Sequence, residues 1–194
     1  MSLFIDIKNQ IGYSTQASVD WFRLAAERLR ISGRNSVKDG ILQNKDNNLV
    51  TSIEIGKLYY FQYDALHKDT LPYWDRYPLI FVLNRDRDGF LGLNMHYLRP
   101  DLRIAFFNKL QQFASDKRLN PRAKLAVTYR MISDFSQFPE VQHCIKRYLW
   151  GHVKTRWMEV PPDSWRNVVM LPLQSFTGQQ ASQVWAAQNK RKKR

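Results

Sequence analysis

Cysteine is almost absent from this chain, which has a single one, Cys144. One cysteine excludes a disulfide within the chain and a zinc cluster built on cysteines, so the composition favours an intracellular protein. Long hydrophobic runs are also missing, because no window approaches the roughly 18 uncharged residues of a membrane span. The stretch MSLFIDIKNQIGYS lacks the basic start and the sustained apolar run of a signal peptide. We therefore expect a soluble protein.

The sequence motifs of the common enzyme classes are missing as well. The chain contains no P-loop, no GxGxxG after a strand, no HExxH, no GxSxG and no EF-hand loop. His96, close to Asn94, could act as a general base, but a lone histidine in a sheet is more often a hydrogen-bonded structural residue. We therefore expect no catalytic residue, no cofactor and no bound metal.

One polar segment does carry residue types that occur in metal sites. Asp64, His67, Asp69 and Asp75 lie close together in the sequence, in a loop of the kind where solvated charges are usual. A metal-dependent nuclease would need two or three acidic groups around a divalent ion. This segment leaves a nuclease as the third hypothesis, behind the two given below.

Acidic residues are scarce relative to basic ones. The chain has 30 Lys and Arg against 17 Asp and Glu, which gives a net charge of +13 and a pI near 10.0. Residues 174–194 hold no acidic residue and end in KRKKR. Lys and Arg release condensed counterions when they contact phosphate, so each contact adds affinity that does not depend on base sequence. The charge therefore favours a polyanionic partner, above all nucleic acid.

Basic and aromatic residues alternate between residues 146 and 166. Trp and Tyr rings can stack on unpaired bases, so this mixture suits a DNA strand or a DNA end. In the alternative interpretation the rings form core and the basic groups form a solvated rim. The rings belong to Tyr148, Trp150, Trp157 and Trp165. The predicted DNA-binding residues are Lys146, Arg147, Lys154, Arg156 and Arg166, with Lys190, Arg191, Lys192, Lys193 and Arg194 of the tail.

The pattern of apolar residues predicts an α+β fold. Strand-forming residues fill Leu79–Leu83 and Phe90–Tyr97, and the polar residues 85–89 between them predict a hairpin. The simplest architecture is a small antiparallel β-barrel of the SH3-like or OB-like kind with a helical layer. Further strands are predicted at Lys57–Tyr63, His152–Val160 and Val168–Leu173, and helices from Pro100, from Pro121 and at Pro139–Trp150.

An amphipathic helix is predicted near the amino terminus, from about Thr15 to Ile31. Its apolar face includes Trp21, Phe22 and Leu29. We expect this face to pack on the core, and the alternative hypothesis is that it packs on another subunit. A polar linker follows it. The chain therefore divides into an N-terminal arm (1–55), an α+β body (56–173) and a basic C-terminal tail (174–194).

Three segments of the body resemble a known family. YYFQYDALHKDTLPYWDRYPLIF, DGFLGLNMHYLRPDLR and IKRYLWGHVKTRWMEVPPDSWRNVVMLPLQSF are similar to a small virion protein of T-even-like contractile-tailed phages, of the DNA end protector or head-completion type. The resemblance covers about residues 56–176. It implies an injected or neck-associated protein that binds the ends of packaged linear DNA and shields them from host exonucleases, and it implies no catalytic residue.

Two hypotheses of function follow from charge and resemblance together. The leading one is a virion structural protein that binds linear double-stranded DNA ends without sequence preference. The alternative is a structural adaptor of the tail, baseplate hub or neck, whose arm contacts other virion subunits. In either case we expect assembly in the host cytoplasm and a place in the virion.

Overall fold

The computed structural model describes residues 48–171 and 173–190. Its centre is a six-stranded sheet in the order β1-β7-β2-β4-β5-β6, in which every neighbouring pair is antiparallel. A separate two-stranded sheet joins β3 and β8. The bounds are β1 Leu49–Val50, β2 Leu58–Tyr60, β3 Trp74–Asp75, β4 Leu79–Arg85, β5 Gly89–Asn94, β6 Ile145–Leu149, β7 Trp157–Glu159 and β8 Phe176–Thr177.

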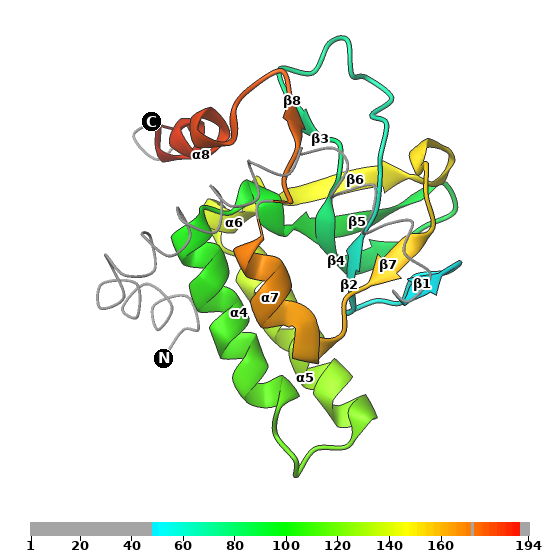
Figure 1. Ribbon diagram of the computed structural model, residues 1–194, viewed down its shortest axis with the longest axis vertical. Helices are drawn as coiled ribbons and strands as arrows, with labels where there is room; N and C mark the ends of the chain where they lie inside the picture. The colour runs from blue at the N-terminus through cyan, green and yellow to red at the C-terminus, as the bar shows by residue number, and fades with distance from the viewer. Residues whose placement is uncertain (1–47, 172, 191–194) are drawn as a thin grey trace.

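Helices cover one face of the large sheet (Figure 1). Helices α4, α5 and α7 lie together on that face, and α8 lies to one side. The α+β class is therefore confirmed. The predicted SH3-like or OB-like barrel is not, because β1 and β6 end the sheet and no pairing closes it among the described residues. The helices are α4 Pro100–Ala114, α5 Pro121–Ser136, α6 Pro139–Gln142, α7 Trp165–Met170 and α8 Ala181–Lys190, with 3-10 turns η1 Met95–Tyr97, η2 Trp150–His152 and η3 Pro162–Ser164.

The predicted hairpin is present as β4 and β5, but the second strand is shorter than predicted. It ends at Asn94, whose side chain caps the 3-10 turn η1 that Met95–Tyr97 form instead. The turn of the hairpin depends on Asp86, whose side chain accepts hydrogen bonds from the backbone N–H groups of Asp88 (2.9 Å) and Gly89 (2.7 Å). On β5, a Cβ at Gly92 would lie 2.6 Å from the Cδ1 of Ile80, so a neighbouring side chain does approach this glycine closely. The local signals of the hairpin were sufficient to place both strands.

Helices α4 and α5 begin where the sequence predicts them. Each starts with a proline, which has no backbone N–H to lose at that position. The Asn120 side chain caps α5 by accepting a hydrogen bond from the Ala123 N–H at 2.8 Å. These two helices are thus determined by local chemistry.

The helix predicted at Pro139–Trp150 is wrong beyond its first turn. Only α6 is helical, and the following residues form β6, which pairs with β5 from Gly89 opposite Leu149 to Leu93 opposite Ile145. Strand β5 is largely buried, so its outer backbone groups need hydrogen-bond partners, and β6 supplies them. This tertiary requirement overrides the helical spacing of the apolar residues.

The strand predicted at Val168–Leu173 is also wrong. Val168 and Val169 belong to α7, which packs on α4 and contributes both side chains to the core. A short apolar run does not distinguish a buried strand from a buried helix. The strand predicted at His152–Val160 is present only in its second part, as β7.

The core lies on both faces of the sheet. Leu58 and Tyr60 of β2 face a large cluster shared with the helices, whereas Tyr59 and Phe61 face a second, mostly aromatic cluster. All four are at most 1% exposed. The alternation in sequence accounts for this, since both faces of this strand carry aromatic or aliphatic side chains.

A buried carboxylate joins the small sheet to the large one. Asp75 of β3 is 3% exposed and accepts a hydrogen bond from the His96 ring at 2.7 Å. It also accepts bonds from the Asn94 side chain (3.3 Å) and from the N–H groups of Tyr77 (3.2 Å) and Ser175 (3.1 Å). Trp185 of α8 donates to the His96 carbonyl at 2.9 Å. The network therefore fastens β3, the end of β5, the segment before β8 and α8 together.

Gly89→Ala tests the close packing of β5 against β6. A Cβ at this position would overlap the carbonyl oxygen of Tyr148, so we expect the variant to lose about 1–3 kcal/mol of unfolding free energy in urea. Gly151→Ala is the matched control, because a Cβ there meets nothing within 4 Å. Equal stability of the two variants would contradict the observed register.

Asp75→Asn tests the buried network. Burial raises the pKa of Asp75, but the charge of His96 and the hydrogen bonds from His96, Ser175 and Asn94 outweigh it, so the folded-state pKa lies below the ordinary value. A lowered folded-state pKa gives stability that is present above the unfolded pKa of about 3.9 and is lost as pH falls below it. We expect the variant to lose about 3–5 kcal/mol at neutral pH and to have a flatter acid limb in urea unfolding between about pH 5 and 3.

The exposed Asp69→Asn serves as control for Asp75→Asn. An Asp75→Asn variant whose stability falls with acid as steeply as that of the unmodified protein would show that the network does not cause the acid sensitivity.

Candidate nucleic-acid interface

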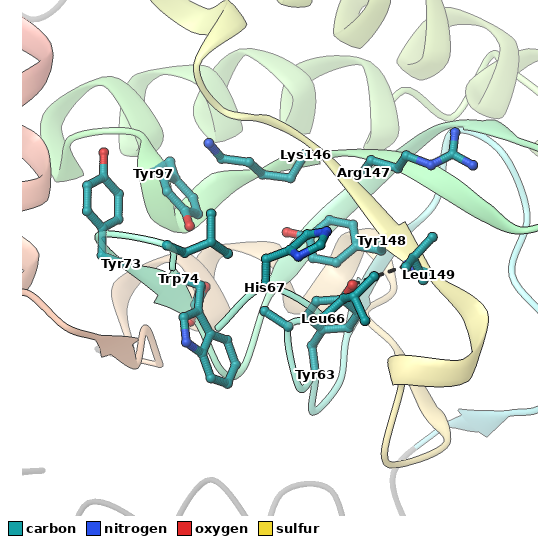
Figure 2. Close-up of a pocket in the computed structure, with 13 residues that line it drawn as sticks. Tyr63, Leu66, His67, Tyr73, Trp74, Tyr97, Lys146, Arg147, Tyr148 and Leu149 are labelled. Atoms are coloured by element: carbon teal, nitrogen blue, oxygen red, sulfur yellow. Dashed lines mark hydrogen bonds between the residues drawn. The ribbon is translucent and has the colours of Figure 1, made fainter. Parts of the chain in front are cut away.

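Two of the predicted DNA-binding residues lie side by side on the edge strand β6. Lys146 places its ammonium 4.4 Å from the centre of the Tyr97 ring, an arrangement in which the negative ring face stabilises the cation. The Arg147 guanidinium instead pairs with Asp86 of the hairpin, with N···O distances of 2.7 and 3.1 Å. Figure 2 shows Arg147 pointing away from the other labelled residues. Arg147 thus shares its charge with Asp86, and Lys146 holds its charge against an aromatic ring.

Lys154 and Arg156 lie in the exposed segment between η2 and β7. The Lys154 N–H donates to the Gln62 carbonyl at 2.9 Å, which fixes the backbone of this segment to the end of β2. The nearby Asp64 has a lowered pKa, first because Lys68 donates a hydrogen bond to it and further because of the charges of Lys68, Lys154 and His152. A basic rim therefore surrounds one carboxylate at this end of the molecule.

The side chains of the other predicted DNA-binding and partner-binding residues lie outside the part of the chain that the structure describes. Arg166 belongs to α7 in the helical layer, and its side chain lies outside the part of the chain that the structure describes. Lys190 ends α8. Outside the described residues lie Arg191, Lys192, Lys193, Arg194, Trp21, Phe22 and Leu29, together with the helix predicted around the last three.

The aromatic residues interleaved with this basic segment are mainly core. Tyr148, Trp157 and Trp165 are between 3% and 7% exposed. Trp150 is half-buried, and its ring is tilted against that of Phe90 with the centroids 4.7 Å apart. Its indole N–H donates to the Asp86 carbonyl at 3.2 Å. The interpretation in which these rings are core is therefore confirmed for the first three. Trp157 and Trp165 present no face to a nucleic-acid base, whereas Tyr148 also lines the pocket described next.

A pocket of about 410 Å³ lies beside β6 instead (Figure 2). Its volume falls in the range of roughly 300–1,000 Å³ that is usual for small-ligand sites. Burial, Asp75 and Tyr73 raise the pKa of Tyr97, so its phenol is neutral here. Sequence reasoning missed this pocket, although the run PYWDRYP is rich in aromatic residues. The lining is aromatic and apolar with a few charged groups, and its rings are Tyr63, Tyr73, Trp74, Tyr97 and Tyr148.

The candidate metal ligands are not brought into one site. Asp64 pairs with Lys68 at 3.1 Å, whereas Asp75 is buried against His96. No group of three His, Cys, Asp or Glu side chains able to hold a metal ion occurs among residues 48–171 and 173–190. His96 is fully buried and hydrogen-bonded, which is the structural role that the sequence favoured. No helix in the described ranges is long and apolar enough to cross a membrane.

Comparison with known proteins identifies the family. Residues 8–193 match the family described as Phage T4 terminal DNA protecting protein. The match extends beyond the resemblance seen at residues 56–176 into the arm and the tail. No curated protein and no solved structure matches the chain. The match covers most of the length of the chain, and the matched family consists of structural proteins that protect DNA ends and are not enzymes. The chain therefore belongs to the family of phage terminal DNA protecting proteins.

Proposed function

We propose that this chain protects terminal DNA by covering the end of linear duplex DNA without reading its sequence. The proposal is supported by the exposed basic residues Lys154 and Arg156 and by Lys146 on β6, in a member of a DNA-protecting family. A protein bound at an end blocks an exonuclease by occupying its substrate, so no catalytic residue is required. Affinity comes from phosphate contacts and counterion release.

The charged groups are not expected to contribute equally. Lys154 and Arg156 are exposed, and neither side chain hydrogen-bonds to another described residue. Arg147 already gives two hydrogen bonds to Asp86, so DNA must share it with that carboxylate. Lys68 is likewise paired with Asp64. Substitution of Lys154 and Arg156 should therefore weaken DNA binding more than substitution of Arg147.

The two ends of the chain would assist this surface. The basic cluster Lys190–Arg194 would act as an electrostatic tether to DNA. The predicted helix with Trp21, Phe22 and Leu29 would hold the protein to other virion subunits, after assembly in the host cytoplasm. The alternative of a tail, baseplate or neck adaptor that acts only through protein contacts is not favoured, because the matched family is defined by its protection of DNA.

A filter-binding titration with linear duplex DNA tests the proposal directly. We expect log affinity to fall steeply and linearly with log salt concentration, with a slope of about −0.9 for each phosphate contacted. In the double variant Lys154→Gln, Arg156→Gln the magnitude of this slope should fall by about 2. Absence of binding at low salt would refute the proposal.

The matched control is Lys117→Gln, Arg122→Gln, which removes the same charge from exposed positions in the turn after α4 and in the first turn of α5. It should leave most of the slope in place. An equal effect of the two double variants would mean that net charge alone, and not this surface, determines binding.

Protection can be measured with an exonuclease that degrades linear duplex DNA from its ends. The unmodified protein should slow digestion, and the Lys154→Gln, Arg156→Gln variant should slow it several-fold less at equal concentration. An excess of covalently closed circular DNA should compete only weakly if ends are the preferred site. A circle that competes as well as linear DNA would contradict binding at ends.

A further inference from the structure

The pocket follows the outer edge of β6. Lys146, Arg147, Tyr148 and Leu149 all line it, and its opposite wall is the segment from Tyr63 to Asp75. Strand β6 ends the six-stranded sheet, so its outer side has no strand partner among the described residues. The site therefore combines a strand edge with an aromatic wall.

The backbone N–H and carbonyl of Arg147 point away from β5, towards the outer side of β6. The Leu149 N–H donates to the Tyr63 hydroxyl at 3.2 Å, so it is not directed at β5. Backbone groups of an antiparallel pair alternate in direction from one residue to the next. Arg147 lies two residues from Leu149, so its N–H and carbonyl are directed outward too. The pocket thereby has a donor and an acceptor side by side, as the edge of a nucleic-acid base requires.

The exposed rim of the pocket is unusually apolar for a basic protein. Leu66 is 52% exposed and Leu71 is 43% exposed. Behind them, Tyr73 and Trp74 are half-buried and line the same space. Aromatic and aliphatic side chains at this spacing suit a flat, uncharged ring that can stack.

The charged groups of the pocket favour one orientation of a bound nucleotide. Asp75 is one of the lining residues, and its buried negative charge disfavours a phosphate on that side. The Lys146 ammonium lies above Tyr97 in the same lining and is suited to a phosphate. A nucleotide would fit this arrangement with its base towards the Trp74 and Asp75 wall and its phosphate at Lys146.

We propose that this pocket binds the base of an unpaired nucleotide at the end of a DNA strand. The inference rests on the proposed function and refines it, because a base inside a duplex is stacked and paired and cannot enter a closed pocket without being extruded. An unpaired terminal base enters at little cost. The pocket would thus distinguish a DNA end from the duplex interior, which phosphate contacts alone cannot do.

A peptide strand added to β6 fits the pocket less well. The bond from Leu149 to Tyr63 blocks one end of the strand edge. The rings of Tyr73, Tyr97 and Phe176 pack together at the other end, with centroids 5.0–6.3 Å apart. The short opening between them suits one nucleotide better than the several residues of an added strand.

Two linear duplexes that differ only at one end provide the test. Both carry a short single-stranded extension at one end and a streptavidin block at the other, and in the second duplex the extension has no bases. We expect the unmodified protein to bind the first duplex more tightly by roughly 5- to 150-fold in fluorescence anisotropy, the range known for loss of base–aromatic stacking. Trp74→Ala and the rim variant Leu66→Glu should remove most of this difference.

Ile55→Glu and Tyr129→Ala are the matched controls. Both residues are exposed apolar side chains, 40% and 37%, outside the pocket lining. Both controls should keep the base dependence, and thermal unfolding checks that Trp74→Ala is folded. Because Leu66 is largely exposed, Leu66→Glu tests the pocket even if Trp74→Ala unfolds.

The outcomes separate the two proposals. Equal affinity for both duplexes, with steep salt dependence retained, would overturn the pocket inference and leave the proposed function intact. Retention of the base dependence in folded Leu66→Glu would also overturn the inference. Failure to bind either duplex would overturn the proposed function itself.

Discussion

The buried bond between Asp75 and His96 is the interaction on which the arrangement of this molecule depends. A carboxylate withdrawn from water is stable only if its oxygens are satisfied, and here both are, by groups from three separate stretches of chain. The same bond holds β3 against the main sheet and so positions the aromatic wall of the pocket. Packing of β2, β4 and β5 provides the rest of the stability, but it does not by itself place that wall.

Elements with strong local signals were predictable from the sequence. The β4–β5 hairpin and the starts of α4 and α5 depend on turn residues, on proline and on the Asn120 cap, all of which act over a few positions. Strand β6 was not predictable, because it forms to satisfy the backbone of β5, which is distant in sequence. The strand predicted from Val168 was wrong for a different reason, since the apolar run that ends helix α7 fits either a strand or a helix.

The candidate site was only partly predictable. Net charge indicated nucleic acid, but Lys146 and Arg147 were predicted on a helix and lie on strand β6. Their side chains also differ in role, with Lys146 at the pocket and Arg147 held by Asp86. Asp75 looked like a loop carboxylate, because nothing in its neighbourhood in sequence reveals that His96 lies beside it. The family match supplies what charge cannot, since it connects the chain to DNA ends.

Both edges of the large sheet are poor templates for pairing with another copy of the chain. At one edge β1 has only two residues. At the other, β6 carries adjacent basic side chains, and the segment from Tyr63 to Asp75 lies alongside it. Short or charged edges of this kind hinder sheet-to-sheet aggregation. The basic strand β6, which we assign to DNA binding, thus also disfavours self-association of the protein at high concentration.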